Sequence, residues 1–293
     1  MARETAAPYL PGPPFPSLRP MRPFPKLRVP RILLLVLIGY AAFAGLVWLF
    51  AERLIFLPPR QVYTQTPEIL LIPREGGGTI AAVHLRNPRA RYTLLFSHGN
   101  GEHLGDDLPF LREMRDAGFS VLAYDYSGYG LSTGRPSERA AYVDVDAAYH
   151  YLTRTAGVPP ERIIAHGRSL GGAVAADLAS RRPVAGLVLE STFTTIFRVV
   201  RSYPLVPFDR FRTADKLPRV TAPVLVIHGT RDEVVAFAHG ERLYEMAPAP
   251  KHRLWVQDAG HNDLQWVAGE RYWDALRRFA GSLPDAGDAK EQG

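Results

Sequence analysis

The sequence of 293 residues contains no cysteine. This absence excludes disulfide bonds, a thiol nucleophile and the structural zinc sites that depend on thiolate ligands. It leaves the compartment open, because a cysteine-free chain is compatible with an oxidising space and with the cytosol. Thiol chemistry therefore has no part in the function of this protein.

The chain also has almost no net charge outside residues 1–31. The chain has 35 basic and 29 acidic residues, a net charge of +6. Residues 1–31 hold six of the basic residues and one of the acidic residues, so the remaining chain is close to neutral. Binding to nucleic acid depends on clustered basic charge that attracts phosphates, and the long remainder has no such excess. We therefore expect no nucleic-acid partner.

The first fifty residues have a composition unlike the rest of the chain. Nine prolines in residues 1–30 predict a disordered or polyproline-like tail over residues 1–31. Residues 32–51 then read ILLLVLIGYAAFAGLVWLFA, twenty residues without a charge. As a helix this segment spans about 30 Å, the thickness of the hydrocarbon core of a bilayer. The run predicts a transmembrane helix.

Two other interpretations of this apolar run remain open. A buried core helix normally keeps a polar face, which this run lacks. A cleaved signal peptide fits the small-x-small sequence Ala42-Phe43-Ala44, but cleavage there leaves a strongly apolar new terminus. We expect an uncleaved single-pass anchor, with the basic tail in the cytoplasm and the catalytic domain on the far, periplasmic or extracytoplasmic, side.

Residues 52–281 have the size and pattern of one α/β domain, followed by a disordered tail at residues 282–293. Short apolar runs alternate with amphipathic stretches, which is typical of βαβ units around a mostly parallel sheet with helices on both faces. The first two strands flank three glycines and predict an antiparallel hairpin. The eight expected strands are residues 69–72, 80–85, 93–97, 120–124, 162–165, 184–189, 224–228 and 253–256. The expected helices are residues 104–117, 138–155, 170–181, 236–247 and 263–281.

One interval between two strands departs from this alternation. Residues 192–221 are rich in proline, arginine and aromatic residues, and we expect a small cap over the carboxyl edge of the sheet. The aromatic side chains of this region fit the wall of an apolar substrate pocket, and ordinary core packing explains them equally well. They are Phe193, Phe197, Tyr203, Phe208 and Phe211.

The sequence Gly167-Arg168-Ser169-Leu170-Gly171 follows an expected strand and precedes an expected helix. In this strand-turn-helix context the G-x-S-x-G pattern predicts a nucleophile elbow, in which small neighbours allow a strained serine backbone. The N-terminus of the following helix offers backbone N–H groups beside the serine. We therefore predict Ser169 as the nucleophile.

A serine hydroxyl needs a base to remove its proton and a carboxylate to orient that base. The strand at residues 224–228 leads to Asp232, and the last strand leads to His261. Because the carboxyl ends of parallel strands meet at one edge of the sheet, both side chains are expected near Ser169. The order serine, acid, histidine matches that of α/β hydrolases. Glu190, at the end of a neighbouring strand, is the alternative acid.

An oxyanion intermediate needs two fixed hydrogen-bond donors. We predict the backbone N–H of Leu170 as the first donor. The second is expected in the loop Ser97-His98-Gly99-Asn100-Gly101, from the N–H of Asn100, with Gly101 as the alternative. His98 is expected to brace this loop.

The motifs together resemble one branch of the α/β hydrolases. The similarity extends over residues 52–281 and is to the Bem46-like proteins, which include the membrane-associated α/β-hydrolase domain-containing proteins 13 and 17. It rests on Ser97-His98-Gly99-Asn100, Gly128-Tyr129-Gly130-Leu131-Ser132, Gly167-Arg168-Ser169-Leu170-Gly171-Gly172, His228-Gly229-Thr230-Arg231-Asp232 and Gly260-His261-Asn262-Asp263.

The resemblance implies a serine hydrolase of esters or thioesters with Ser169, Asp232 and His261 at the positions of the triad. The cysteine-rich N-terminus through which some eukaryotic members are palmitoylated is absent here, so a depalmitoylase role is not transferred.

The sequence therefore predicts an acyl hydrolase that needs no metal or cofactor and acts on a small-molecule or lipid-like acyl ester. Two alternatives stay open. One is a serine peptidase of the same fold, because one fold supports several chemistries. The other is a catalytically inactive, membrane-anchored binding or scaffold protein. The oligomeric state does not follow from the sequence.

Overall fold

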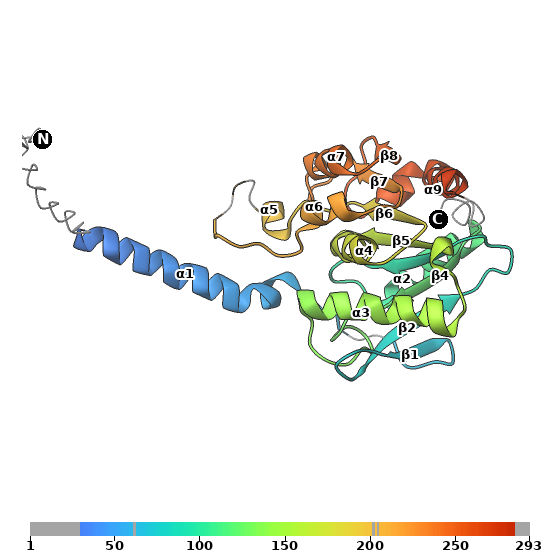
Figure 1. The fold of residues 1–293 in the computed structure, drawn as a ribbon, viewed down its shortest axis with the longest axis horizontal. Coiled ribbons are helices and arrows are strands. Elements are labelled where there is room, and N and C mark those ends of the chain that lie inside the picture. Colours follow the sequence, from blue (N-terminus) through green and yellow to red (C-terminus); the bar gives the residue numbers. More distant parts are fainter. Residues whose placement is uncertain (1–29, 61–62, 201–202, 204, 285–293) are drawn as a thin grey trace, which may run out of the picture. The chain divides into compact units, whose positions relative to one another are not determined.

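The computed structural model describes residues 30–60, 63–200, 203 and 205–284 (Figure 1). The chain divides into two units between Phe43 and Ala44. The tails predicted at 1–31 and 282–293 lie largely outside the described residues, and both boundaries stay predictions.

The helix α1 (Arg31–Ile55) contains the predicted apolar run and extends it by one turn. Among the described helices it is the one long and apolar enough to cross a membrane, and nearly all of its apolar side chains are exposed. A signal sequence passes the same test of length and composition. At its C-terminal end, Ala51 and Ile55 are buried.

An eight-stranded sheet forms the centre of the domain, in the order β1-β2-β4-β3-β5-β6-β7-β8. β1 and β2 form the predicted antiparallel hairpin, β2 also pairs antiparallel with β4, and the remaining pairs are parallel. The fold predicted from the sequence is confirmed. The strands are β1 (Ile69–Pro73), β2 (Thr79–Leu85), β3 (Thr93–Ser97), β4 (Ser120–Tyr124), β5 (Ile163–Arg168), β6 (Gly186–Glu190), β7 (Val224–Gly229) and β8 (Lys251–Val256).

Helices cover both faces of the sheet, because alternate residues of its inner strands point to opposite sides. Leu95 of β3 belongs to the core under one set of helices, and its neighbour Leu94 to the core under the other. Figure 1 shows two helices of the first set, α3 and α4, side by side. The first set is α3 (Glu138–His150), α4 (Leu170–Arg181) and α7 (Phe237–Met246), and the second is α2 (Leu104–Asp116), α8 (Leu264–Ala268) and α9 (Glu270–Ser282).

Two helices that were predicted as continuous are interrupted in the structure. The expected helix 138–155 continues after α3 as a π-helical turn, Tyr151–Thr155. The expected helix 263–281 is divided into α8 and α9 at Gly269, whose φ is +54°. A positive φ interrupts an α-helix and is tolerated best by glycine.

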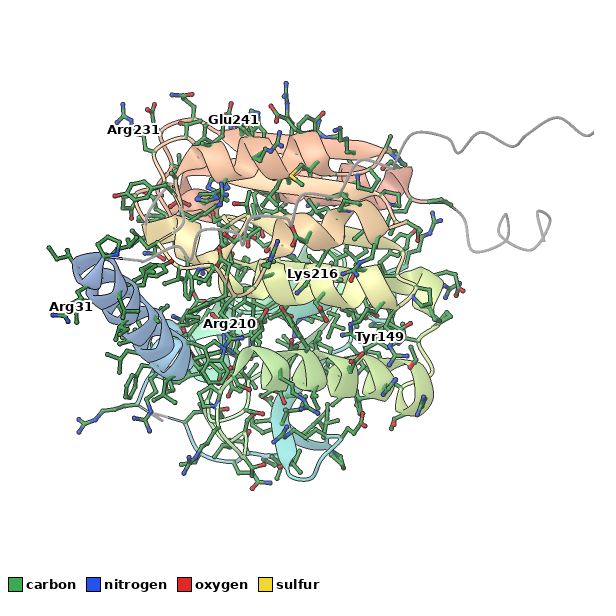
Figure 2. All side chains as sticks on the ribbon, turned by 60° about the vertical axis from the view of Figure 1, so that its left-hand side comes forward. Arg31, Tyr149, Arg210, Lys216, Arg231 and Glu241 are labelled. Carbon is green, nitrogen blue, oxygen red and sulfur yellow. The ribbon has the colours of Figure 1, made fainter. Side chains whose placement is uncertain are left out.

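The predicted cap segment lies between β6 and β7. It contains α5 (Ile196–Val200), α6 (Thr213–Lys216) and the 3-10 turn Leu217–Arg219. Lys216 is buried, and its Nζ lies 3.1 Å from Asp177 Oδ1 on α4 (Figure 2). This ion pair connects the segment to α4, the helix that follows Ser169.

Candidate active site

Ser169 lies at the turn between β5 and α4 with a φ of 51° and a ψ of −117°. Such a conformation costs a non-glycine residue about 1–3 kcal/mol and persists only where the surroundings hold it. The Ser169 N–H donates to the carbonyl of Glu190 at 2.8 Å. The hydroxyl of Thr192 donates to the Ser169 carbonyl at 2.6 Å. Hydrogen bonds from the end of β6 and from Thr192 just after it therefore hold both the N–H and the carbonyl of Ser169.

The glycines of the elbow are required by close backbone contacts. A Cβ on Gly171 would lie 1.9 Å from the carbonyl oxygen of Ser97, and a Cβ on Gly167 would lie 2.1 Å from the carbonyl oxygen of Gly171. No L side chain fits at either position without displacing backbone. The same contact brings the loop after β3 against the start of α4, where the oxyanion donors were predicted.

The structure brings the three residues of the predicted triad together. His261 Nδ1 lies 2.8 Å from Asp232 Oδ2, and His261 Nε2 lies 3.1 Å from Ser169 Oγ. The other oxygen of Asp232 accepts the N–H groups of Val234 and Val235 at 3.0 and 2.7 Å. His261 and Asp232 are both buried.

The environment of Asp232 favours its ionised form. Burial alone raises the pKa of this carboxyl, but His228 and His261 on the same carboxylate outweigh it and lower the pKa well below the ordinary value. His228 Nε2 lies 3.3 Å from Asp232 Oδ2 and also donates to the carbonyl of Val235 at 2.9 Å. An ionised Asp232 fixes His261 with Nδ1 protonated, which leaves Nε2 to accept the serine proton.

Glu190, the alternative acid, has other partners. Its carboxylate accepts the hydroxyl of Tyr272 at 2.7 Å and lies 2.9 Å from His166 Nε2. Burial raises the pKa of Glu190, but these contacts and the charge of Arg168 outweigh it, so the pKa is lowered. Glu190 thus holds the strand next to the elbow, and Asp232 is the carboxylate on His261.

The predicted oxyanion donors have backbone N–H groups that are free for a ligand. In the described part of the chain, neither the Leu170 N–H nor the Asn100 N–H donates to a protein acceptor. The N–H of Gly99 is unavailable, because it donates to Glu102 Oε2 at 2.7 Å. His98 braces the loop as expected, through its Nδ1 donating to the Gly99 carbonyl at 2.7 Å.

One residue of the site was not anticipated from the sequence. Arg168, directly before Ser169, pairs with Glu102 Oε1 at 3.0 Å and donates to Asn262 Oδ1 at 3.2 Å. Its Nε lies 4.0 Å from Glu190 Oε1. Arg168 therefore links the loop after β3, the elbow, the end of β6 and the loop that carries His261. The sequence signal that could have indicated this role is the charge of Arg168 within the otherwise uncharged motif Gly167–Gly171.

One group among the described side chains has ligand atoms close enough for a metal ion, namely His98, Glu102 and Asp107. Glu102 is already engaged by the Gly99 N–H and by Arg168. Burial lowers the pKa of His98, but Asp125 and Asp107 outweigh it and raise the pKa to about 9, so His98 is cationic at neutral pH. Burial raises the pKa of Asp107 to about 7. A protonated histidine and a neighbouring guanidinium disfavour a cation, and the group is an ionic network behind the loop.

The aromatic residues of the predicted cap divide into two sets. Phe193 and Phe211 are fully buried within the core, so packing explains them. Phe197 and Phe208 pack edge to face with ring centroids 6.0 Å apart, and Tyr203 is 56% exposed. The apolar acyl pocket stays a prediction.

The sheet order, the strand-turn-helix at Ser169 and the helices on both faces define an α/β hydrolase. A family model described as "Serine aminopeptidase, S33" matches residues 88–207. Alpha/beta hydrolase domain-containing protein 17C of Xenopus laevis is 43% identical over 211 residues, covering 70% of this chain and 67% of that protein. Alpha/beta hydrolase domain-containing protein 17B of Xenopus tropicalis is 37% identical over 262 residues, covering 78% and 90%. The chain belongs to the family of α/β-hydrolase domain-containing protein 17.

Solved structures agree on the fold. An esterase of Pyrococcus furiosus superimposes with a TM-score of 0.65 and 20% identity, covering 78% of this chain and 99% of that one. At this identity the likeness shows the α/β-hydrolase fold alone. The family and the fold together make this protein a hydrolase.

Proposed function

We propose that this protein is a membrane-anchored serine hydrolase that cleaves ester or thioester bonds through an acyl-enzyme. The observation that carries the proposal is the continuous path from Asp232 through His261 to Ser169, with contacts of 2.8 and 3.1 Å. Each atom along this path has the donor or acceptor character that serine activation needs.

In the first step, His261 Nε2 accepts the proton of Ser169 Oγ as this oxygen attacks the carbonyl carbon of the substrate. Asp232 stabilises the resulting imidazolium without taking its proton. His261 then donates that proton to the leaving oxygen or sulfur, and Ser169 carries the acyl group. A water molecule, deprotonated by His261, releases the acid and regenerates Ser169.

The negative oxygen that develops on the substrate needs donors that are already in place. The free N–H of Leu170 at the start of α4 supplies one, and the Asn100 N–H is the second, with Gly101 as its alternative. Loss of one such donor raises a barrier by about 3–4 kcal/mol. Both N–H groups lie on segments that touch each other through Gly171 and Ser97.

The first test is labelling of the detergent-solubilised full chain with a fluorophosphonate, which reacts with activated serines. We expect labelling of the wild type and of the matched control Ser180→Ala, at the other end of α4, and no labelling of Ser169→Ala. Labelling of Ser169→Ala contradicts the assigned nucleophile. A folded wild type that does not react supports the inactive scaffold instead.

A peptidase is the second candidate, favoured by the match to the serine aminopeptidase family model over residues 88–207. The chemistry of the triad serves amides as well as esters. Turnover of acyl esters, acyl thioesters and aminoacyl anilides by the same preparation separates the candidates. We expect Ser169-dependent turnover of esters and thioesters over a range of acyl lengths, whereas turnover confined to anilides supports the peptidase.

The anchor is proposed from α1, whose exposed apolar side chains are costly in water and stable in a bilayer. The basic tail before it favours a cytoplasmic N-terminus and a domain on the far side. The absence of cysteine makes the test direct. Glu241 is exposed on α7, so Glu241→Cys gives a single thiol on the domain (Figure 2). We expect a membrane-impermeant maleimide to label it in intact spheroplasts, and labelling only after lysis contradicts this orientation.

A further inference from the structure

A short segment that precedes the first strand packs onto the catalytic domain. Ile55 and Phe56, at the end of α1, are 8% and 3% exposed. The Phe56 ring packs edge to face against Tyr129 and Phe211, with centroid distances of 6.3 and 5.7 Å. Leu57 follows with its side chain 61% exposed, so its contribution lies in its backbone. This segment is held by specific contacts, as a passive tether would not be.

Its backbone is bonded to the side chain of Asn100, whose main-chain N–H is the proposed oxyanion donor. Asn100 Nδ2 donates to the Ile55 carbonyl at 2.5 Å. Asn100 Oδ1 accepts the Leu57 N–H at 3.1 Å. Both ends of the Asn100 amide are therefore used by a segment more than forty residues earlier in the chain.

Tyr129 completes this network from the loop after β4. Its hydroxyl donates to Asn100 Oδ1 at 2.7 Å and accepts the Leu57 N–H at 3.1 Å. The side chain is fully buried, and burial raises the pKa of the phenol, so the hydroxyl keeps its proton. Tyr129 thus holds Asn100 and Leu57 at the same time.

The loop that carries Asn100 has need of such a restraint. Gly101 follows with a φ of +78°, a conformation in which the loop turns sharply. On its other side the loop is fixed by Glu102 on the Gly99 N–H. Asn100 lies between these points, and its own main-chain N–H has no protein acceptor among the described residues. The direction of the Asn100 N–H is therefore set by the hydrogen bonds that the Asn100 side chain forms.

We propose that Tyr129 and the backbone of Ile55–Leu57 are positioning elements of the active site, which aim the Asn100 N–H by holding its side chain amide. The inference rests on the proposed serine hydrolase mechanism. It makes the residues at the end of α1 a part of the active-site support. Loss of the network rotates one oxyanion donor and leaves Ser169 and His261 in place.

The test uses the full chain in detergent, with Tyr129→Phe, Asn100→Ala and the double variant. The matched control is Tyr149→Phe, on α3, which also removes a tyrosine hydroxyl that is bonded, to the Pro183 carbonyl at 2.9 Å (Figure 2). Melting temperature, kcat, KM and the rate of fluorophosphonate labelling are measured for each, with Ser169→Ala in the same series.

We expect Tyr129→Phe to lower kcat about 10-fold, because small misplacements of catalytic groups cost up to about 100-fold. Asn100→Ala should lower it further, the labelling rate should fall in parallel with kcat, and KM should stay within about twofold. The double variant should lose less than the product of the two single losses, because both remove one network. Tyr149→Phe should match the wild type in kcat.

Two outcomes overturn the inference separately from the mechanism. If Ser169→Ala is inactive but Tyr129→Phe keeps the kcat of Tyr149→Phe, the positioning role is wrong and the serine mechanism stands. A loss in Tyr129→Phe that follows melting temperature or KM, with kcat unchanged, also overturns it. If Ser169→Ala keeps activity, the mechanism itself is wrong and the inference falls with it.

Discussion

Replacement of Arg168 by methionine tests whether the residue before Ser169 holds the candidate site together. Methionine keeps much of the apolar length of the side chain and removes the guanidinium. The change deletes the 3.0 Å pair with Glu102 and the 3.2 Å hydrogen bond to Asn262. It also leaves Glu190, whose carboxylate is 97% buried, with less positive charge nearby.

The size of the effect follows from the burial of the partners. Breaking a fully buried ion pair by removing one partner costs about 3–5 kcal/mol, and one charged hydrogen bond contributes about 1.5–3 kcal/mol. The Arg168 and Glu102 side chains are 18% and 22% exposed, so water compensates for part of the loss. We expect Arg168→Met to lower the free energy of unfolding by about 2–3 kcal/mol. For a domain of this size that is a fall of about 4–12 °C in melting temperature.

The pH dependence should change in a defined direction. The lowered pKa of Glu190 means that its ionised form stabilises the fold at neutral pH, and this stability is lost as pH falls through the folded-state pKa. Because Arg168 contributes to that lowering, Arg168→Met should raise the Glu190 pKa. The loss of stability that Glu190 contributes on acidification, below about pH 5, should therefore be smaller in the variant than in the wild type.

The assay is a double-mutant cycle of Arg168→Met and Glu102→Gln, measured by thermal unfolding and by kcat. Arg181→Met is the control, because Arg181 pairs with Asp146 and Asp177 at 2.8 and 2.6 Å near the other end of α4. We expect a coupling of about 1 kcal/mol or more between Arg168 and Glu102 in stability, and a lower kcat in Arg168→Met but not in Arg181→Met. Independent effects of Arg168 and Glu102, or an unchanged kcat in Arg168→Met, refute the reasoning.

Three further changes have defined outcomes. Asp232→Asn should lower kcat by about 10⁴-fold with an unchanged circular dichroism spectrum, because the amide no longer favours the required histidine tautomer; a loss under tenfold contradicts this. Gly171→Ala should lower the free energy of unfolding, measured by chemical denaturation, by about 3 kcal/mol or more, because its Cβ would lie 1.9 Å from a backbone oxygen. The control Gly281→Ala, on α9, has no atom within 4 Å of its Cβ and should raise the same free energy by up to about 1 kcal/mol. Burial lowers the pKa of His98, but Asp125 and Asp107 outweigh it and raise the pKa to about 9. The stability from these contacts is therefore complete below about pH 6.5 and lost as pH rises through 9. His98→Gln should remove that slope from the free energy of unfolding measured between pH 6 and 10.

Much of the fold was predictable because its signals are local. Strands were recognised from short apolar runs, and the elbow from Gly167, Ser169 and Gly171 between a strand and a helix. His261 and Asp232 were placed near Ser169 by one rule of topology, which brings the carboxyl ends of parallel strands to one edge. The break at Gly269 was missed, because a glycine inside an amphipathic pattern does not by itself show a positive φ.

The support of the site was not predictable in the same way. Arg168 and Asn262 are 94 residues apart, and no periodicity or strand order relates an arginine in the elbow to an asparagine beside His261. The side chain of Asn100 is bonded to a segment that precedes the first strand, where the alternation of strands and helices gives no position. Such contacts follow from the angle at which loops leave the sheet, which depends on packing and not on pattern.

This difference has a consequence for how the site responds to substitution. The residues proposed to carry the chemistry are positioned by the edge of the sheet, so variants that leave the sheet intact should keep Ser169, Asp232 and His261 together. The proposed oxyanion donor, the Asn100 N–H, depends on contacts from three separate segments, which are the end of α1, the loop after β4 and the elbow. Each contact contributes only a small part of the stability of the domain. A variant can therefore change the direction of the Asn100 N–H while remaining folded. Changes in kcat without loss of fold should therefore cluster in these supporting contacts.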